Sequence, residues 1–124
     1  MSQIAFGRIL VVIAGLLGAM GVASAAGASH GEEGRLLGSI ATIALAHAPA
    51  LLVLGLVSPP GRWIRLAAVV MTVGTLLFIG DLSTRQWLGQ GLFPGAAPMG
   101  GGLMMLGWLG VGAAALFRSS FNFR

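Results

Sequence analysis

The sequence predicts an all-α integral membrane protein, an up-down bundle of four transmembrane helices with both termini in the cytoplasm. Hydrophobic residues make up 56% of the 124 residues and charged residues only 8%, whereas about 25% of the residues in a soluble domain are charged. The mean hydropathy is +0.94. Four apolar runs also reach the roughly 20 residues that a helix needs to cross a bilayer. We expect residues 1–124 to form a single membrane domain.

The four predicted helices follow the apolar runs and are separated by short polar or glycine-rich turns. None of the runs alternates apolar and polar residues with a period of two, which argues against a β-barrel. Pro59 and Pro60 end the second run, because proline cannot continue a helix. Short connections make sequential helices antiparallel neighbours. The helices are predicted at residues 4–26, 36–57, 63–83 and 98–117.

The first apolar run also allows a second interpretation. Arg8, the apolar stretch after it and the small residues Ala23, Ser24 and Ala25 resemble a secretory signal with its cleavage site. The run is longer than the apolar core of a usual signal, and its removal would leave three spans. We therefore favour a membrane-spanning helix.

The arginines predict the orientation. The net charge is +4, and positive residues gather on the cytoplasmic side of membrane proteins. Two arginines, Arg35 and Arg85, fall on one side of the predicted bundle together with Glu32 and Glu33. The opposite side, which we expect to be cytoplasmic, carries Arg8, Arg62, Arg65, Arg118 and Arg124.

The same charges limit the partners. The arginines stand singly or in one pair beside apolar runs, whereas phosphate binding needs a cluster of cations on one face. We expect no nucleic-acid partner. The expected partner is the lipid bilayer, specifically a bacterial-type inner membrane that the chain crosses several times. Trp63 and Trp87, near the two ends of the third span, are expected to be interfacial anchors.

Small residues recur at a spacing of four on two of the predicted helices. Such stripes let helix backbones approach closely within a membrane. Packing inside the bundle is one interpretation, and a seam for another protomer or subunit is the other. The first helix carries Gly15, Ala19, Ala23 and Gly27, and the fourth carries Gly107, Val111 and Ala115 beside Gly110 and Ala114.

His47 lies near the middle of the second span, where ionisable residues are candidates for function. A neutral imidazole can also be a structural residue that bonds to a carbonyl or to a hydroxyl on a neighbouring helix. The candidate hydroxyls are those of Thr42, Thr72 and Thr75. Pro49 follows two residues later and frees a backbone carbonyl, which would help to open a polar pocket.

Asp81 lies near the outer end of the third span, and Arg85 is four residues further on the same helix face. An interfacial pair with Arg85 reaching outward is one interpretation. The other is that Asp81 turns inward and meets a group from another helix, such as His30 in the outer turn.

Enzyme chemistry is not indicated. The spacing of His30, Glu32 and Glu33 matches no metal-binding motif. The sequence contains no cysteine, no P-loop and no nucleophile elbow. We therefore expect no metal, no cofactor and no catalytic residues.

Four short segments of the chain carry a resemblance. They are residues 18–23 with His30, Ala46 and His47 with Leu51 and Leu52, Leu77 and Phe78 with Gly80 and Leu82, and Ala97, Pro98, Met99, Gly100 and Gly101 with Gly107 and Trp108. In order and spacing these segments resemble those of a known family, the YgdD-like inner-membrane proteins of unknown function. The resemblance implies four helices in an inner membrane, and it draws attention to Gly18, Gly100, Gly101, His30 and His47. The chain departs from the family pattern at residues 43–46, where the family has a tyrosine–glutamine pair, and at Ile79 and Asp81, where it has serines.

Two hypotheses for function follow from the sequence. The first is a non-enzymatic small membrane protein, either an accessory or assembly subunit of a larger complex or a self-associating bundle. The second is a binding or transport module for a small molecule or ion, with a polar pocket around His47, Asp81 and His30.

Overall fold

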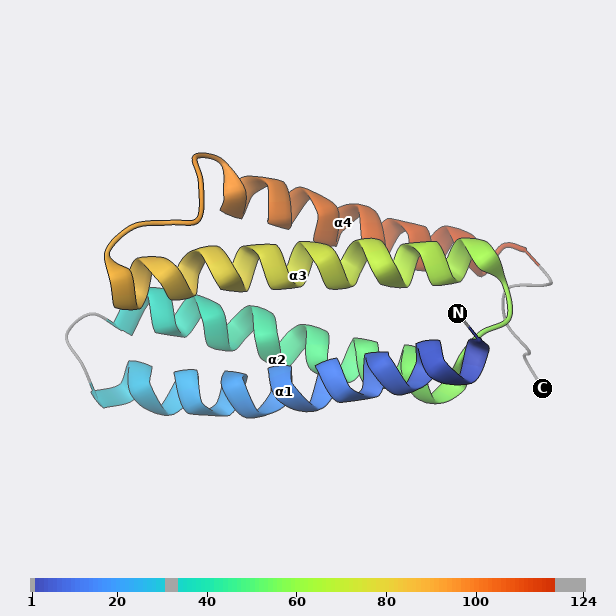
Figure 1. The fold of residues 1–124 in the computed structure, drawn as a ribbon, viewed down its shortest axis with the longest axis horizontal. Coiled ribbons are helices and arrows are strands. Elements are labelled where there is room, and N and C mark those ends of the chain that lie inside the picture. Colours follow the sequence, from blue (N-terminus) through green and yellow to red (C-terminus); the bar gives the residue numbers. More distant parts are fainter. Residues whose placement is uncertain (1, 31–33, 118–124) are drawn as a thin grey trace.

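Four α-helices make up nearly all of residues 2–30 and 34–117, which are the residues that this computed structural model describes (Figure 1). They are α1 (Gln3–His30), α2 (Gly34–Val57), α3 (Arg62–Leu88) and α4 (Ala96–Ala114). Each helix is long and apolar enough to cross a membrane. The expectation of an all-helical chain with four apolar helices is confirmed.

The helices form two antiparallel hairpins that meet along a single seam. α1 packs on α2, α3 packs on α4, and the hairpins join where α2 packs on α3. The start of α1 and the end of α4 lie at the same end of the bundle (Figure 1). α2 and α3 are therefore the central helices, with α1 and α4 flanking them.

Each hairpin is closed by a reciprocal pair of glycines. A Cβ atom added to Gly7 would lie 2.6 Å from the carbonyl oxygen of Gly55, and one added to Gly55 would lie 2.8 Å from that of Gly7. In the second hairpin, Gly74 and Gly100 have the same relationship at 2.7 and 2.8 Å. Real Cβ atoms do not approach so closely, so only glycine permits these backbone contacts.

The residues of α1 that pack inside the hairpin recur every seven positions, as in Gly7, Ala14 and Gly21, or Leu10, Leu17 and Ser24. Seven residues nearly complete two turns of a 3.6-residue helix, so this set stays on one face. A spacing of four advances about 40° with each step. Gly15, Ala19 and Ala23 therefore move away from α2 and are exposed.

Several helix boundaries differ from those predicted by two residues or more. α1 continues to His30, so this histidine is the last helical residue rather than part of a turn. α3 continues to Leu88, which makes Arg85 and Trp87 helical. Helical backbone hydrogen bonds persist into polar surroundings, although hydropathy falls earlier. α4 begins at Ala96, because Pro98 is tolerated in a first turn whose N–H groups lack helical acceptors, and it ends at Ala114.

Ser58 ends α2 and holds the start of α1. Its φ of 45° lies in the left-handed region, which is unusual for a residue other than glycine. The Ser58 hydroxyl donates to the carbonyl oxygen of Gln3 at 2.8 Å, and the Gln3 amide donates to the carbonyl of Ser58. These bonds fix the turn before Pro59 and Pro60 against the first residues of α1.

Candidate functional site

A hydrogen bond in the middle of the bundle joins the buried His47 on α2 to Trp108 on α4. The indole N–H of Trp108 donates to Nε2 of His47 at 3.0 Å. Nδ1 of His47 lies 2.8 Å from the carbonyl oxygen of Ile43, one turn earlier. The two rings meet edge to face, with centroids 5.7 Å apart.

These contacts determine the tautomer of His47. An indole N–H can only donate, so Nε2 must be the acceptor. The carbonyl of Ile43 can only accept, so Nδ1 carries the proton and donates it. Both ring nitrogens of a neutral imidazole are thereby satisfied, and the side chain is only 5% exposed. In this state neither nitrogen is available to a metal or a ligand.

The hydroxyl partners expected for His47 are used elsewhere. Thr42 bonds to the carbonyl of Gly38, Thr72 to that of Ala68 and Thr75 to that of Met71, each within its own helix. Of the two kinds of partner expected, His47 therefore bonds to a backbone carbonyl, that of Ile43, and to none of these threonine hydroxyls. Trp108 is the partner that the sequence reasoning missed. A tryptophan well inside an apolar span was the available signal, because an indole N–H among apolar side chains requires an acceptor.

Asp81 is fully buried in the C-terminal part of α3 and bonds to two groups. Nε of Arg85 donates to Oδ2 at 2.9 Å, and Arg85 itself is 45% exposed. The backbone N–H of Leu92, in the connection to α4, donates to Oδ1 at 2.9 Å. The pair with Arg85 therefore forms, and Asp81 turns inward. Its further partner is the α3–α4 connection rather than His30.

The α3–α4 connection folds tightly over this carboxylate. Gly91 leaves no room for a side chain, because a Cβ there would collide with Oδ1 of Asp81 and lie 2.9 Å from Nη2 of Arg85. Gly89 and Gly95 adopt positive φ values of 79° and 85° at the two ends of the connection. Asp81 thus acts as an anchor for residues 89–95.

The remaining candidate residues lie apart from these two centres. His30 is exposed at the end of α1. Trp63 and Trp87 are exposed near the two ends of α3. Glu32, Glu33, Arg118 and Arg124 lie outside the described residues. Within residues 2–30 and 34–117, no three histidine or acidic side chains come close enough to hold a metal ion.

The glycines and alanines singled out for helix packing divide into two groups. Gly100 and Gly107 are buried against α3, where an added Cβ would meet the backbone of Phe78 or Met71 at 2.7–2.9 Å. Gly27 and Gly18 are half-buried, with Leu37 and Ala48 respectively as their nearest neighbours. Added Cβ atoms at Gly15 and Gly101 would meet nothing within 4 Å. The open group also includes the exposed Ala19 and Ala23.

A comparison with protein families identifies the family of this chain. A family model described as a protein of unknown function, DUF423, matches residues 15–101. The chain belongs to the DUF423 family. No curated protein and no solved structure matches it.

The DUF423 match covers His30, His47 and the Asp81–Arg85 pair together with Leu92. It ends before Trp108, the donor to His47. The described contacts of these residues are internal, and they bring His47 and Asp81 into two separate hydrogen-bonded groups.

Proposed function

We propose that this DUF423 protein is a non-enzymatic component of a bacterial-type inner membrane, either an accessory or assembly subunit of a larger complex or a self-associating bundle. It crosses the bilayer four times, with both termini in the cytoplasm. The length and hydropathy of the four helices support the crossings. The excess of arginine at the end of the bundle that contains the start of α1 supports the orientation.

One face of α4 carries this proposal. Gly101, Met105, Trp108 and Gly112 follow one another at helical spacing, and an added Cβ at Gly101 or Gly112 would meet nothing within 4 Å. Met105 is 65% exposed between them. A glycine inside a helix costs about 1 kcal/mol relative to alanine. Contact with a helix of another chain would explain why glycine, despite this cost, occupies positions that pack on nothing within the protein.

The internal polar contacts also support a structural role. His47 and Asp81, the buried ionisable residues among those described, have their polar atoms bonded within the protein. A transport or binding function at these residues would have to break those bonds first.

Within the DUF423 family, we further propose that the chain belongs with the YgdD-like proteins. The support is the resemblance of the four short segments described in the sequence analysis, the last of which contains Gly107 and Trp108.

Association can be tested in native lipid. The protein is extracted with its surrounding membrane by an amphipathic polymer, and its mass and co-purifying chains are measured. We expect a homo-oligomer or a stable partner chain. Gly112→Leu should dissociate that assembly, while Gly15→Leu, an equally open glycine on α1, should leave it intact. A monomer without a co-purifying chain would contradict the proposal.

A further inference from the structure

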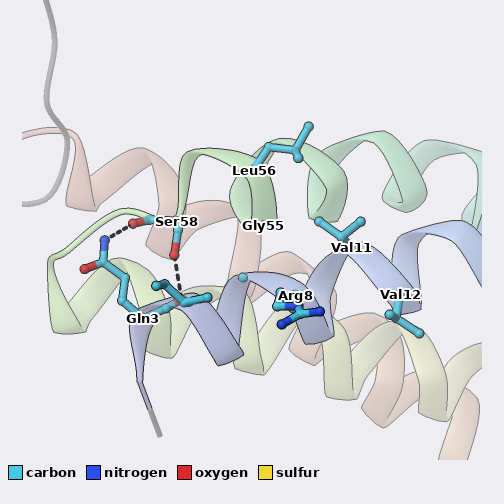
Figure 2. Close-up of a pocket in the computed structure, with 9 residues that line it drawn as sticks. Gln3, Arg8, Val11, Val12, Gly55, Leu56 and Ser58 are labelled. Carbon is cyan, nitrogen blue, oxygen red and sulfur yellow. Dashed lines mark hydrogen bonds between the residues drawn. The ribbon is translucent and has the colours of Figure 1, made fainter.

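A groove runs along the outer side of the α1–α2 hairpin. It consists of two hollows of about 550 and 490 Å³ that meet at Val11, which lines both. The first lies between the start of α1 and the end of α2 (Figure 2). The second continues past Gly15 and Gly18 on α1 and Pro49 on α2. We refer to the two together as the α1–α2 groove.

Small residues create the groove, and its walls are apolar. An added Cβ on Gly15 would meet nothing within 4 Å, and on Gly18 only the Cβ of Ala48 at 3.9 Å. Valine and leucine side chains form the rims. Water gains little in such a space, because it needs polar partners. An empty groove would also forfeit the dispersion contacts of its lining. In a bilayer the natural occupant is a flexible apolar chain.

A cation lies at one end of the groove. Arg8 is exposed and lines the first hollow, as Figure 2 shows. Among the described residues, no hydrogen bond or ion pair engages its guanidinium. Asp81, the acid whose place the structure describes, lies at the opposite end of the bundle. Gln3 and Ser58 line the same hollow and add polar atoms beside Arg8. This end of the groove therefore suits an anionic, hydrogen-bonding headgroup.

The length of the groove matches one leaflet. The roughly ten residues from Arg8 to Gly18 rise about 15 Å along a helix at 1.5 Å per residue. This is half of the roughly 30 Å hydrocarbon core of a bilayer. A helix of a second copy would instead cross both leaflets, and it would bring no charge to Arg8 at a fixed depth.

We propose that the α1–α2 groove binds one anionic phospholipid, with its phosphate on Arg8 and an acyl chain running past Val11 to Gly15 and Pro49. The site lies in the cytoplasmic leaflet. It rests on the membrane placement proposed above and is independent of association through α4. Arg8 and the open glycines then belong to a single binding site.

The test is native mass spectrometry of the protein released from nanodiscs that contain equal amounts of phosphatidylglycerol and phosphatidylcholine. We expect one retained phosphatidylglycerol per chain, in clear excess over phosphatidylcholine. Arg8→Gln should reduce this preference about fivefold, the factor expected of one cation at an anionic surface. Gly15→Leu should reduce retention of both lipids, because the new side chain fills the groove without displacing a neighbour.

Two variants serve as matched controls. Arg62→Gln removes the same charge at the same end of the bundle, but Arg62 lies over the ring of Trp63 and does not line the groove. Gly112→Leu enlarges an equally open glycine on α4. Both should retain phosphatidylglycerol as the unaltered protein does.

Several results would overturn the inference. Equal retention of the two lipids, or equal loss in Arg8→Gln and Arg62→Gln, would show a general surface attraction without a site. Dissociation of an oligomer by Gly15→Leu would assign the groove to a second copy. A labelling experiment that failed to find four crossings would instead remove the membrane placement, so the two failures are distinguishable.

Discussion

Trp108 and His47 form a hydrogen bond between two helices that are not neighbours in the bundle, with the indole N–H donating to Nε2 at 3.0 Å. α4 packs on α3, and α2 packs on α3 from the other hairpin. The two long side chains therefore tie the second hairpin to the first across α3.

Replacing Trp108 with phenylalanine should destabilise the protein by about 1–3 kcal/mol, because it leaves a buried imidazole nitrogen without a donor. Unfolding by a denaturing detergent in mixed micelles measures this loss. Trp87→Phe is the control, since Trp87 is 64% exposed. Equal effects of the two changes would contradict a special role for the bond.

The tautomer of His47 can be observed directly. We expect solid-state NMR of the ¹⁵N-histidine-labelled protein to show a neutral ring with the proton on Nδ1, because Trp108 requires Nε2 as acceptor. His30→Gln leaves a single histidine and removes ambiguity in assignment. A proton on Nε2 would rule out the geometry described.

Asp81 should control the order of the α3–α4 connection. Asp81→Ala removes the acceptor for the backbone N–H of Leu92, so hydrogen exchange at that amide should become much faster. Asp81→Asn keeps an oxygen acceptor and should preserve more of the protection, although the ion pair with Arg85 is lost. Unchanged exchange at Leu92 in Asp81→Ala would show that the connection is held by other contacts.

Gly100 and Gly101 are adjacent, yet replacement by alanine should lower the free energy of unfolding at Gly100 and raise it at Gly101. Gly100→Ala places a Cβ 2.7 Å from the backbone nitrogen of Phe78, and such overpacking costs about 1–3 kcal/mol. Within a single chain, Gly101→Ala enters open space, so in the monomer that denaturing detergent leaves, alanine should stabilise the helix by about 0.5–1 kcal/mol. The same detergent unfolding measures both. Similar changes in the free energy of unfolding for the two variants would contradict the close approach of α3 and α4.

The absence of native cysteine makes the topology simple to test. Single cysteines introduced at Ser2, Pro60 and Gln90 can be labelled in intact cells with a membrane-impermeant maleimide. We expect labelling at Gln90 from outside, and labelling at Ser2 and Pro60 only after permeabilisation. The reverse pattern would place the termini outside and would also move the proposed lipid site to the other leaflet.

Hydropathy predicted the number and approximate extent of the helices, because four apolar stretches of sufficient length leave few alternatives. It could not locate the ends of α1 and α3, where His30 and Leu88 remain helical beyond the apolar stretch. Backbone hydrogen bonding continues there regardless of side-chain polarity. Pro59 and Pro60 marked the end of α2 correctly, since proline acts on the backbone itself.

The candidate site was harder to predict than the helices. The sequence singled out His47 and Asp81 because ionisable residues are costly in an apolar span. Their partners, Trp108 and the N–H of Leu92, are distant in sequence and depend on how the hairpins pack. The four-residue stripe on α1 was a visible pattern, but contact with α2 follows the seven-residue recurrence, which stays on one side of the helix.

The helices pack more closely within each hairpin than between the two hairpins, and this difference has a consequence for assembly. Each hairpin is closed by a glycine pair in backbone contact. Between the hairpins, only α2 and α3 pack closely, the Trp108–His47 hydrogen bond adds a side-chain contact, and the short turn at Ser58–Gly61 joins the two. A hairpin could therefore detach as a unit and dock on the complementary hairpin of a second molecule, an exchange of identical parts that adds no new kind of contact. Lengthening or stiffening this turn would shift the balance between the closed chain and such an intertwined pair.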